Sequence, residues 1–348
     1  MSLSSQICFA LVGCGRIGQV HAREIRRVGK LLAVCDIDPP RMELLSGGED
    51  VRQYASLSSL LEHEHEIDVV VIATPNGLHA EQSIEALKYG KHVLCEKPMA
   101  IRSTDAESMI KAAKSSEKHL VVVKQNRYNP PIQELKRLLD EGKLGKILSV
   151  QINAFWNRTA EYYAQSPWRG TLELDGGTLY TQFSHFVDLM IWFFGDIIEV
   201  KGFRSNTHHA GLIEFEDQGV IALQFESGLQ GSLQYTVNAY EKNMEGSITV
   251  FGKKGTVKVG GAYLNEMSYF SVEVVDKGEG VEQVERVEND MHNPNQYDGY
   301  QGSMSNHPMV YDDLIRLLNG ETNNLASPED GLRTVKAIEK IYSNVHVS

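Results

Sequence analysis

Short apolar runs alternate with amphipathic stretches along the first third of the chain. The apolar runs occupy residues 7–12, 31–35, 67–73, 92–95 and 120–123. Apolar residues at helical intervals fill the stretches between them, with clear examples at 17–28, 77–89 and 104–116. Continuous apolar runs are typical of parallel strands that are buried on both faces. Their alternation with helices predicts a doubly wound parallel sheet.

The pattern changes after Pro130-Pro131. We predict a helix over 132–139, a long strand over 147–157 and one helical block over 171–195. Further strands are predicted at 200–204, 211–215, 220–225, 230–236, 247–251 and 256–259. Residues 276–306 are polar and rich in Gly and Asn, which predicts loops, and helices follow at 310–318 and 328–343. Turn residues separate the strands, so an open, mostly antiparallel sheet is expected.

These patterns predict an α/β protein with two domains. Residues 1–126 would form a Rossmann dinucleotide-binding domain. Residues 127–348 would form a C-terminal α+β domain for substrate binding and oligomerisation, with the large open sheet. We expect the last helix, 328–343, to pack back on the first domain.

Three glycines follow the first apolar run directly. Gly13, Gly15 and Gly18 have the spacing G-x-G-x-x-G, and the second apolar run ends in Asp36. In this arrangement the first glycine permits a tight turn, the second lets a pyrophosphate approach the backbone, and the third lets the helix pack on its strand. Strand, glycines, helix, strand and acid occur in the order that dinucleotide binding requires.

The acid at the end of the second strand favours NAD over NADP. Asp36 can accept hydrogen bonds from both hydroxyls of the NAD adenosine ribose and would repel an additional 2′-phosphate. Arg16 and Arg41 keep NADP open as an alternative, because an arginine near the ribose can bind that phosphate.

Composition excludes several classes of protein. A net charge of −12 argues against a general nucleic-acid surface. No apolar run approaches the roughly 20 residues that span a bilayer, and the first residues lack the apolar region of a signal peptide, so we expect a cytoplasmic protein with no membrane partner. The four cysteines form no C-x-x-C pair and no metal-ligand constellation stands out, so no metal is predicted.

Two residues could carry proton chemistry. Lys97 follows the end of a predicted strand, where its side chain could stabilise the alkoxide that forms as hydride leaves a hydroxyl. A surface lysine before a rigid turn is the alternative. His185 lies in an apolar helical segment and could act as a general base if it faces the nicotinamide. A core histidine with one satisfied nitrogen is the alternative there.

Cationic and aromatic side chains concentrate between residues 124 and 169. Arginines bind carboxylate or phosphate through two parallel hydrogen bonds, and aromatic faces stack on bases or sugars. This set predicts an anionic substrate and comprises Lys124, Arg127, Arg158, Tyr162, Tyr163, Trp168 and Arg169.

Four motifs together resemble the glucose–fructose oxidoreductase/inositol dehydrogenase/MocA (Gfo/Idh/MocA) family. They are GCGRIG, ATPNGLH at 73–79, EKPMA at 96–100 and the pattern GGT…H..D at 176–188. The resemblance covers nearly the whole chain. It implies that Lys97 and His185 match the catalytic lysine and histidine of the family, and that the open sheet supports a homo-oligomer, a dimer or a tetramer.

Longer stretches are more similar to the bacterial UDP-N-acetyl-glucosaminuronate 3-dehydrogenases of surface-polysaccharide (O-antigen, lipopolysaccharide) synthesis. They lie at 121–130, 155–163, 167–177, 181–189 and 244–261. The resemblance implies oxidation of the C3 hydroxyl of a UDP-linked uronate to a 3-keto sugar, with a 2-keto acid as a possible second substrate. The inositol branch has an aspartate where this chain has Thr181, so an Asp–His relay is not expected.

The strand ends and the resemblance together give the expected site residues. Those for the cofactor are Gly13, Gly15, Arg16, Ile17, Gly18, Asp36, Ile37, Thr74, Pro75, Asn76, His79, Glu96, Lys97, Gln125, Trp168 and Arg169. Those for the substrate are Lys97, Lys124, Arg158, Tyr162, Tyr163, Arg169, Thr181, Gln182 and His185. The alternative functions are a dehydrogenase of another sugar or an inositol-like polyol, an NAD-dependent glycosidase, and an NAD-binding sensor without catalysis.

Overall fold

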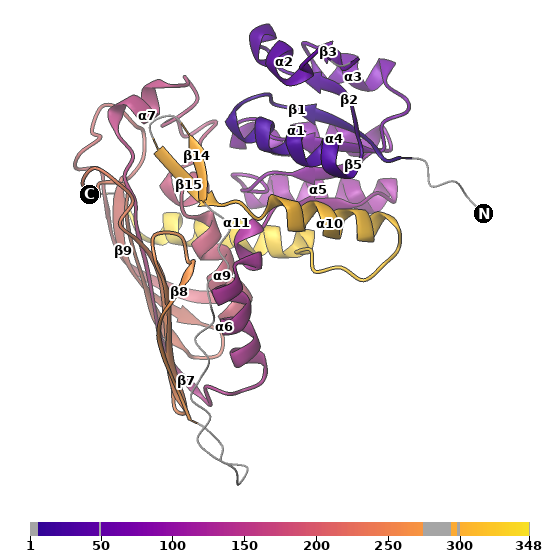
Figure 1. Cartoon of the computed structure of the whole chain (residues 1–348). Coiled ribbons are helices and arrows are strands. Elements are labelled where there is room, and N and C mark those ends of the chain that lie inside the picture. The colour runs from indigo at the N-terminus through magenta and orange to yellow at the C-terminus, as the bar shows by residue number, and fades with distance from the viewer. Residues whose placement is uncertain (1–5, 49, 274–293, 298–299, 348) are drawn as a thin grey trace. The chain divides into compact units, whose positions relative to one another are not determined.

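The chain folds into two compact units in a computed structural model that describes residues 6–48, 50–273, 294–297 and 300–347 (Figure 1). Unit 1 is built from the ranges Met1–Lys124, Glu173–Gly176 and His307–Lys336. Unit 2 is built from Gln125–Leu172, Gly177–Asn306 and Ala337–Ser348.

Unit 1 contains a six-stranded parallel sheet in the order β3-β2-β1-β4-β5-β6. The strands are β1 (Cys8–Val12), β2 (Lys30–Cys35), β3 (Arg52–Tyr54), β4 (Val69–Ile72), β5 (His92–Cys95) and β6 (Leu120–Val122). Its helices are α1 (Arg16–Val28), α2 (Pro39–Ser46), α3 (Leu57–His63), the 3₁₀ turn η1 (Asn76–Leu78), α4 (His79–Lys88), α5 (Ser103–Ser116) and α10 (His307–Leu318), with the first part of α11 (Pro328–Asn344). This is the strand order of a Rossmann fold.

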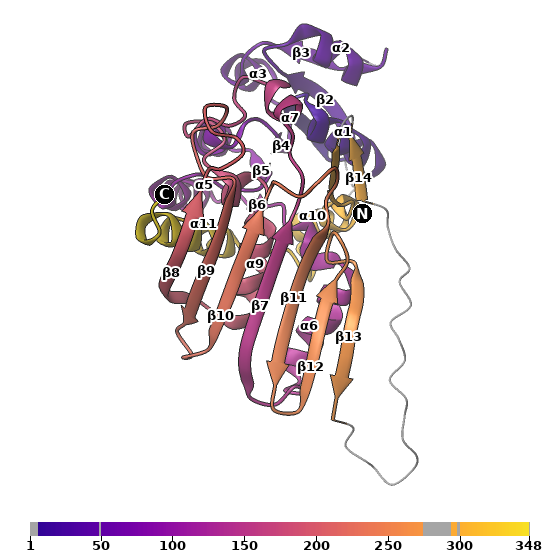
Figure 2. The ribbon, with the colours of Figure 1, turned by 90° about the vertical axis from the view of Figure 1, so that its left-hand side faces the viewer.

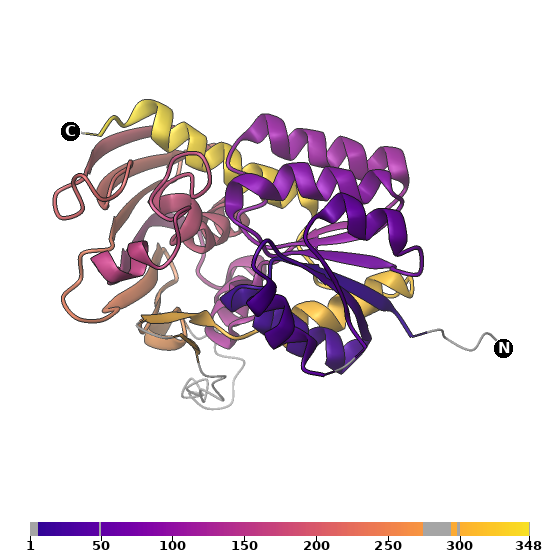
Figure 3. The same cartoon turned by 90° about the horizontal axis from the view of Figure 1, so that it is seen from above.

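Helices cover both faces of this sheet, which explains the unbroken apolar runs of its strands. All four residues of β4 are buried, as are four of the five residues of β1. In Figure 3 the purple helices α4 and α5 lie on one side of the sheet, and α1 and α10 lie on the other. The prediction of a doubly wound parallel sheet is confirmed.

Unit 2 contains a seven-stranded sheet in the order β13-β12-β11-β7-β10-β9-β8 (Figure 2). Its strands are β7 (Ile147–Phe155), β8 (Ile197–Ser205), β9 (Gln218–Phe225), β10 (Gln230–Thr236), β11 (Glu245–Gly252), β12 (Gly255–Gly260) and β13 (Glu266–Val272). Only β7 and β10 pair in parallel among these neighbours. The prediction of a mostly antiparallel sheet is confirmed.

The helices of unit 2 cover one face of this sheet. They are the 3₁₀ turn η2 (Gln125–Tyr128), α6 (Pro130–Asp140), α7 (Ala160–Ala164), α8 (Thr178–Thr181) and α9 (Ser184–Phe194), with the end of α11. Figure 2 shows α6 and α9 behind the strands. Buried and exposed residues accordingly alternate along β9. Antiparallel sheets commonly have one face on the core and one toward solvent.

Three predicted segments of unit 2 differ from the structure. Residues 171–195 are not one helical block, because Gly177 has a φ of +134° and helix begins only at Thr178, with a second break before Ser184. The predicted strand 211–215 is wrong. Gly211 has a φ of +80°, and the segment turns back on Asn206, whose amide donates to the carbonyl groups of Ile213 and Phe215.

The prediction of loops over 276–306 is wrong at 294–297 and 300–304 and is confirmed at 305–306. The backbone of β14 (Pro294–Tyr297) pairs with that of β15 (Tyr300–Met304) in an antiparallel ladder. The turn-forming residues of this segment predicted loops, whereas its backbone forms a short hairpin. The parts of the prediction at 276–293 and 298–299 lie outside the described residues.

No helix in the described part of the chain is both long enough and apolar enough to cross a lipid bilayer.

Candidate active site

The glycine turn of unit 1 joins β1 to α1. Gly13 has a φ of +95°, and a Cβ there would lie 2.5 Å from the carbonyl oxygen of Ala73. A Cβ on Gly18 would lie 2.3 Å from the carbonyl oxygen of Gly13, whereas a Cβ on Gly15 would meet nothing within 4 Å. Gly13 and Gly18 are therefore required by packing inside the unit. Gly15 faces open space, as expected of a glycine whose backbone a phosphate approaches.

Helix α1 begins at this turn without a side-chain cap. Its N-cap residue is Gly15, and no acidic side chain occupies its first turn. The first N–H groups of a helix have no partner within the helix and carry its positive dipole end. This geometry fits the pyrophosphate of a dinucleotide. Arg16 and Ile17, the first two helical residues, are both half-buried.

Asp36 follows β2 and is fixed beside the glycine turn by backbone amides. Its Oδ2 accepts a hydrogen bond of 2.6 Å from the Cys14 N–H, and its Oδ1 accepts one of 2.9 Å from the Asp38 N–H. A carboxylate can accept about four hydrogen bonds, so two ribose hydroxyls fit here as well. Arg41, which left NADP open, forms an ion pair with Asp38 at 3.0 Å. Ile37 is 93% exposed.

The cysteines of unit 1 are free. Burial raises the pKa of Cys14 to about 12, and the neighbouring carboxylate of Asp36 adds to that shift. Cys35 and Cys95 are buried as well, and the pKa of Cys35 is likewise raised to about 12 by burial. These thiols are protonated at neutral pH and pack as small apolar groups.

The loop after β4 contains four of the predicted cofactor residues. Thr74 and Pro75 are half-buried, and the Asn76 amide donates to the Asp175 carbonyl at 2.8 Å. Both ring nitrogens of His79 face carbonyl oxygens, Nδ1 that of Pro98 at 2.7 Å and Nε2 that of Thr74 at 2.9 Å. His79 therefore links this loop to the segment that follows Lys97. Contacts of these four residues with the cofactor remain a prediction.

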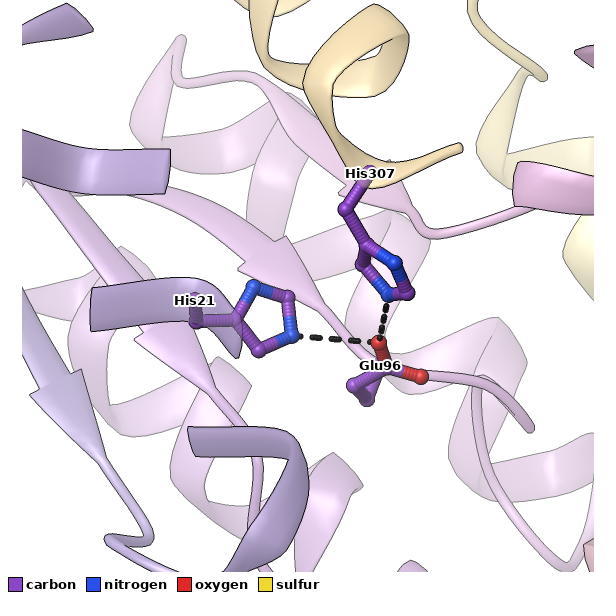
Figure 4. Close-up of side chains that lie close together, drawn as sticks. All are labelled: His21, Glu96 and His307. Atoms are coloured by element: carbon purple, nitrogen blue, oxygen red, sulfur yellow. Dashed lines mark hydrogen bonds and ion pairs between the residues drawn. The ribbon is translucent and has the colours of Figure 1, made fainter. Parts of the chain in front are cut away.

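Glu96 lies at the centre of a buried polar cluster (Figure 4). Its Oε1 accepts from the Nε2 atoms of His21 at 3.1 Å and of His307 at 3.2 Å, and its Oε2 accepts from the Lys97 N–H at 3.0 Å. The Nδ1 of His21 lies 2.9 Å from the hydroxyl of Tyr311. Helices α1 and α10 thus both hold the segment that carries Lys97. The Lys97 side chain is half-buried.

The cluster keeps Glu96 ionised. Burial by itself would raise the pKa of Glu96, but the hydrogen bonds from His21 and His307 outweigh burial and hold the pKa well below its ordinary value. Burial lowers the pKa of His21, with Glu96 opposing. The lowered pKa favours a neutral His21 imidazole that donates from Nε2 to the Glu96 carboxylate. Among the described residues, His21, Glu96 and His307 form the one group with ligand atoms close enough for a metal. That the chain uses no metal remains a prediction.

His185 lies on α9 of unit 2 beside Gln125 of η2. The Nε2 atoms of the two side chains are 3.4 Å apart, and both residues are buried. Arg127 donates from Nε and Nη2 to the two carboxylate oxygens of Asp188, each at 2.9 Å. Asp188 follows His185 by three residues, so this buried ion pair joins the same two elements as the Gln125–His185 contact.

A second polar group in unit 2 brings together substrate residues predicted from distant parts of the sequence. Arg158 donates from Nε to Gln182 at 2.7 Å, and Gln182 donates to the Tyr162 hydroxyl at 2.8 Å. The guanidinium of Arg169 lies 4.0 Å from the Tyr162 ring centroid, and that of Arg158 lies 5.2 Å from it. Two cations therefore flank one aromatic ring. Trp168 lies 5.7 Å from the Arg169 guanidinium.

Tyr163 borders this group, since its ring centroid lies 5.1 Å from that of Tyr162, and both tyrosines pack in an apolar cluster with Ile213 and Phe215. Two further predicted substrate residues lie outside the group. Thr181 is half-buried at the end of α8. Lys124 belongs to unit 1, where its ammonium group donates to Thr334 at 3.3 Å.

Sequence analysis missed the partners of Glu96 and the anchors of η2. His21, His307 and Tyr311 lie within amphipathic helices, and Asn306 precedes one. A polar residue on the inward face of a helix is the only signal such positions give, and it does not identify the partner.

Two family descriptions match the chain. The one described as "Oxidoreductase family, NAD-binding Rossmann fold" matches residues 7–124, and the one described as "GFO/IDH/MocA C-terminal domain" matches residues 132–258. Together with the glycine turn and Asp36, they define an NAD-dependent dehydrogenase. The chain belongs to the Gfo/Idh/MocA family, which confirms the resemblance found in the sequence.

Two solved structures match nearly the whole chain. One is the WlbA dehydrogenase from Chromobacterium violaceum in complex with NADH and UDP-GlcNAcA, with 37% identity, a TM-score of 0.86, and coverage of 99% of this chain and 94% of that one. The other is WlbA from Bordetella pertussis in complex with the same two molecules, with 35% identity, a TM-score of 0.84, and coverage of 97% and 96%.

A third relative has a different reaction. The 2,7-anhydro-N-acetylneuraminate hydratase of Escherichia coli strain K12 is 30% identical over 257 residues, which are 73% of this chain and 67% of that protein. Similarity at 30% identity therefore does not by itself fix the reaction.

Proposed function

We propose that this enzyme oxidises the C3 hydroxyl of UDP-GlcNAcA to a 3-keto sugar for surface-polysaccharide synthesis. The observation that carries the proposal is the similarity, over 97% or more of this chain, to two dehydrogenases solved with NADH and UDP-GlcNAcA. Arg158, Arg169 and the ring of Tyr162 between them support it, because they match the charge and stacking chemistry of an anionic nucleotide sugar.

The cofactor would be held by unit 1. The uncapped start of α1 would take the pyrophosphate, and Asp36 would accept from the adenosine ribose. Glu96 would lie near the nicotinamide ribose, and Gln125 near the nicotinamide. When bound, NAD⁺ supplies the acceptor for the hydride that leaves C3.

Two residues would handle the proton of the C3 hydroxyl. His185 would accept this proton while the C3–O bond becomes a carbonyl, and Lys97 would stabilise the negative charge that develops on the oxygen. Lys97 as the base in place of His185 is the alternative assignment. In either case the C–H electron pair leaves as hydride, so the sugar is oxidised by two electrons and one proton remains on the enzyme.

Arg158, Arg169 and Lys124 are the proposed partners of the anionic groups of the substrate. The guanidinium of Arg158 is already oriented by Gln182 and is almost fully buried, at 2% exposure. A pre-oriented buried cation binds a carboxylate or phosphate with little loss of side-chain entropy.

The enzyme is further proposed to work as a cytoplasmic homo-oligomer, a dimer or a tetramer. The open face of the unit 2 sheet exposes large apolar side chains, among them Phe203 at 77% and Tyr269 at 54%. Apolar patches of this kind mark association surfaces. Free cysteines are in keeping with a reducing compartment. Light scattering coupled to size-exclusion chromatography measures the subunit number.

The test of the function is a product assay. Purified enzyme is mixed with UDP-GlcNAcA and NAD⁺, with and without 2-ketoglutarate, and both NADH and the sugar product are followed. A 3-keto nucleotide sugar supports the proposal, and dependence on the keto acid would show that the cofactor stays bound and is recycled. If NAD binds but no product forms, UDP-GlcNAcA is not the substrate. Oxidation of an inositol would then indicate a polyol dehydrogenase, and release of free sugar from a glycoside would indicate a glycosidase. NAD binding without any of these reactions would indicate a sensor.

A further inference from the structure

Gln125 lies against the imidazole of His185, and the two elements that carry them are joined by a buried ion pair. We propose that Gln125 is a positioning residue that determines which nitrogen of His185 accepts the substrate proton. The inference rests on the proposed role of His185 as the base. The residues that carry it all lie in unit 2.

The backbone of η2 is held in place at the position of Gln125. Asn306 donates from its amide to the Gln125 carbonyl at 3.2 Å and to the Asn129 side chain at 2.6 Å. Asn129 in turn donates to the carbonyl groups of Tyr263 and Leu264, both at 3.1 Å. These buried hydrogen bonds fix the backbone position of Gln125, so its side chain starts from a fixed Cα.

The ion pair fixes α9 against the same segment. Arg127 and Asp188 meet through two parallel hydrogen bonds, and their side chains are 8% and 3% exposed. The Arg127 guanidinium also lies 4.9 Å from the ring centroid of Trp192, one turn further along α9. A paired guanidinium fork adds orientation as well as energy, and stacking on Trp192 restricts it further. Rotation or sliding of α9 past η2 would break these contacts, so the Gln125–His185 distance is set by them.

The atom types at the contact assign the proton. The amide Nε2 of Gln125 can only donate, and it lies 3.4 Å from the Nε2 of His185. A donor facing Nε2 favours the imidazole with its lone pair on Nε2 and its hydrogen on Nδ1. Nε2 can then act as the base once the substrate hydroxyl replaces the Gln125 amide at this single lone pair. When Nε2 takes the substrate proton, the amide can turn about its terminal bond and present its oxygen as an acceptor. Glutamine can partner both protonation states.

The charged groups near α9 do not determine which nitrogen of His185 accepts the proton. Arg127 of η2 and Asp188 of α9 itself neutralise each other. Among the described residues, Lys136 of α6 lies 5.3 Å from the Trp192 centroid, and Arg158 lies over Trp156, whose ring packs on Phe186. Except for Asp188, these groups are cations, which repel an imidazolium and so work in the same direction as the Gln125 donor. A carboxylate at position 125 would act in the opposite direction.

The first experiment measures the pH profile of kcat/KM with UDP-GlcNAcA for wild type, Gln125→Met and Gln125→Glu. We expect Gln125→Met to raise the apparent pKa on the acidic side of the kcat/KM profile by about half to one unit. The reason is that the hydrogen bond to the His185 lone pair, which favours the neutral ring, is lost. The carboxylate favours the imidazolium and raises this pKa further, by more than about one unit. Gln151→Glu, at an exposed position on β7, is the matched control and leaves the limb in place.

The second measurement reads the imidazole directly and needs no substrate. In protein labelled with ¹⁵N-histidine, the His185 resonance, identified by its absence in His185→Gln, reports which nitrogen carries the hydrogen. Hydrogen on Nδ1 in wild type supports the proposal, and hydrogen on Nε2 overturns it. Unchanged acid limbs in both Gln125 variants also overturn it. If wild type does not turn over UDP-GlcNAcA, the proposed function fails, while the resonance still decides the role of Gln125.

Discussion

The cofactor region of unit 1 and the polar groups around His185 in unit 2 are built on different principles. The cofactor region uses backbone and glycine within residues 13–36, closed by hydrogen bonds from the N–H groups of Cys14 and Asp38 to Asp36. The His185 region uses side-chain pairs from distant segments, since Gln125 and His185 are 60 positions apart and Arg127 and Asp188 are 61 apart. Recognition by backbone follows from a local motif, whereas recognition by side chains depends on the tertiary fold.

Three buried carboxylates, Glu96 of unit 1 and Asp188 and Glu216 of unit 2, differ in their partners. In unit 1, Glu96 accepts from two imidazoles. In unit 2, Asp188 and Glu216 are paired with the guanidinium groups of Arg127 and Arg204. A guanidinium neutralises the charge of a buried carboxylate, and removal of either partner leaves the other charge buried without a counter-ion. The following predictions use this difference, from the largest expected effect to the smallest.

Lys97→Ala should cost the most activity. We expect turnover to fall by about a thousandfold, since removal of a group that handles proton or charge transfer typically costs 10²–10⁴-fold. NAD affinity, measured by calorimetry, should change little, because the glycine turn and Asp36 are untouched. Lys88→Ala, at an exposed position on α4, is the control. Loss of NAD binding in Lys97→Ala would show that the lysine is structural.

Asp188→Asn should destabilise unit 2 by about 3 kcal/mol, because it leaves the buried Arg127 charge without its counter-ion. The three tryptophans, Trp156, Trp168 and Trp192, all lie in unit 2, so their fluorescence during urea unfolding reports this unit. Asp140→Asn breaks an exposed ion pair with Lys136 on α6 and should cost at most about 0.5 kcal/mol. Equal losses in the two variants would contradict this interpretation.

Two glycine substitutions separate packing from ligand approach. Gly18→Ala should lower the free energy of unfolding by about 1–3 kcal/mol, because its Cβ would lie 2.3 Å from the Gly13 carbonyl oxygen. Gly15→Ala should leave stability nearly unchanged and weaken NAD binding, because its Cβ meets nothing within 4 Å in the protein. Thermal unfolding and NAD titration of both variants give the comparison. Normal NAD affinity in Gly15→Ala would remove this turn from the pyrophosphate site.

Asp36→Asn should weaken NAD binding by about tenfold, which corresponds to about 1.4 kcal/mol. The amide nitrogen cannot accept from a ribose hydroxyl, and one backbone amide loses its acceptor. The affinity for NADP should fall less than that for NAD, since repulsion of the 2′-phosphate is removed. Titration with both nucleotides measures the ratio. An unchanged ratio would mean that Asp36 serves only the turn.

Acid should act on the two carboxylate clusters with opposite sign. The pKa of Glu96 is lowered, so the native state binds fewer protons than the unfolded chain, and its contribution to stability is lost as pH falls below about 4.3 toward the folded pKa. Burial raises the pKa of Glu216 against the opposing effect of Arg204, so its ionisation costs stability as pH rises above about 4.3.

The slope of the unfolding free energy against pH tests this. Between about pH 6 and pH 3, Glu96→Gln should flatten the loss of stability on acidification, and Glu216→Gln should steepen it. Hydrogen exchange followed by mass spectrometry assigns each slope to its unit. A change of the same sign in both variants would show that the two clusters do not differ as described.

The sequence-based predictions of secondary structure were more accurate for unit 1 than for unit 2. In unit 1 the apolar runs identified β1, β2, β4, β5 and β6, because strands buried on both faces carry unbroken apolar residues. In unit 2 the strand at 211–215 and the single helix over 171–195 were wrong, since Gly211 and Gly177 adopt positive φ values that interrupt apolar sequence. The β14–β15 hairpin was missed because its residues are typical of turns.

The candidate site shows which residues can be predicted from the sequence and which cannot. Gly13, Gly15, Gly18 and Asp36 could be predicted from their spacing and from where the strands end. Lys97 was a candidate by its place after a strand, and its catalytic role is implied by the family resemblance. The partners of Glu96 and of His185 could not be predicted, because hydrogen bonds between buried side chains leave no periodic signal in the sequence.

The sequence by itself determined the parallel sheet, the dinucleotide turn and the acidic residue that follows β2. These features depend on contacts between residues close in the chain and on the apolar character of each strand. Only the tertiary structure decided that His21 and His307 form hydrogen bonds with Glu96. The same holds for the ion pair between Arg127 and Asp188 and for the contact between Gln125 and His185. Such pairs form because burial forces each polar group to find a partner, and the fold alone determines which partner lies within reach.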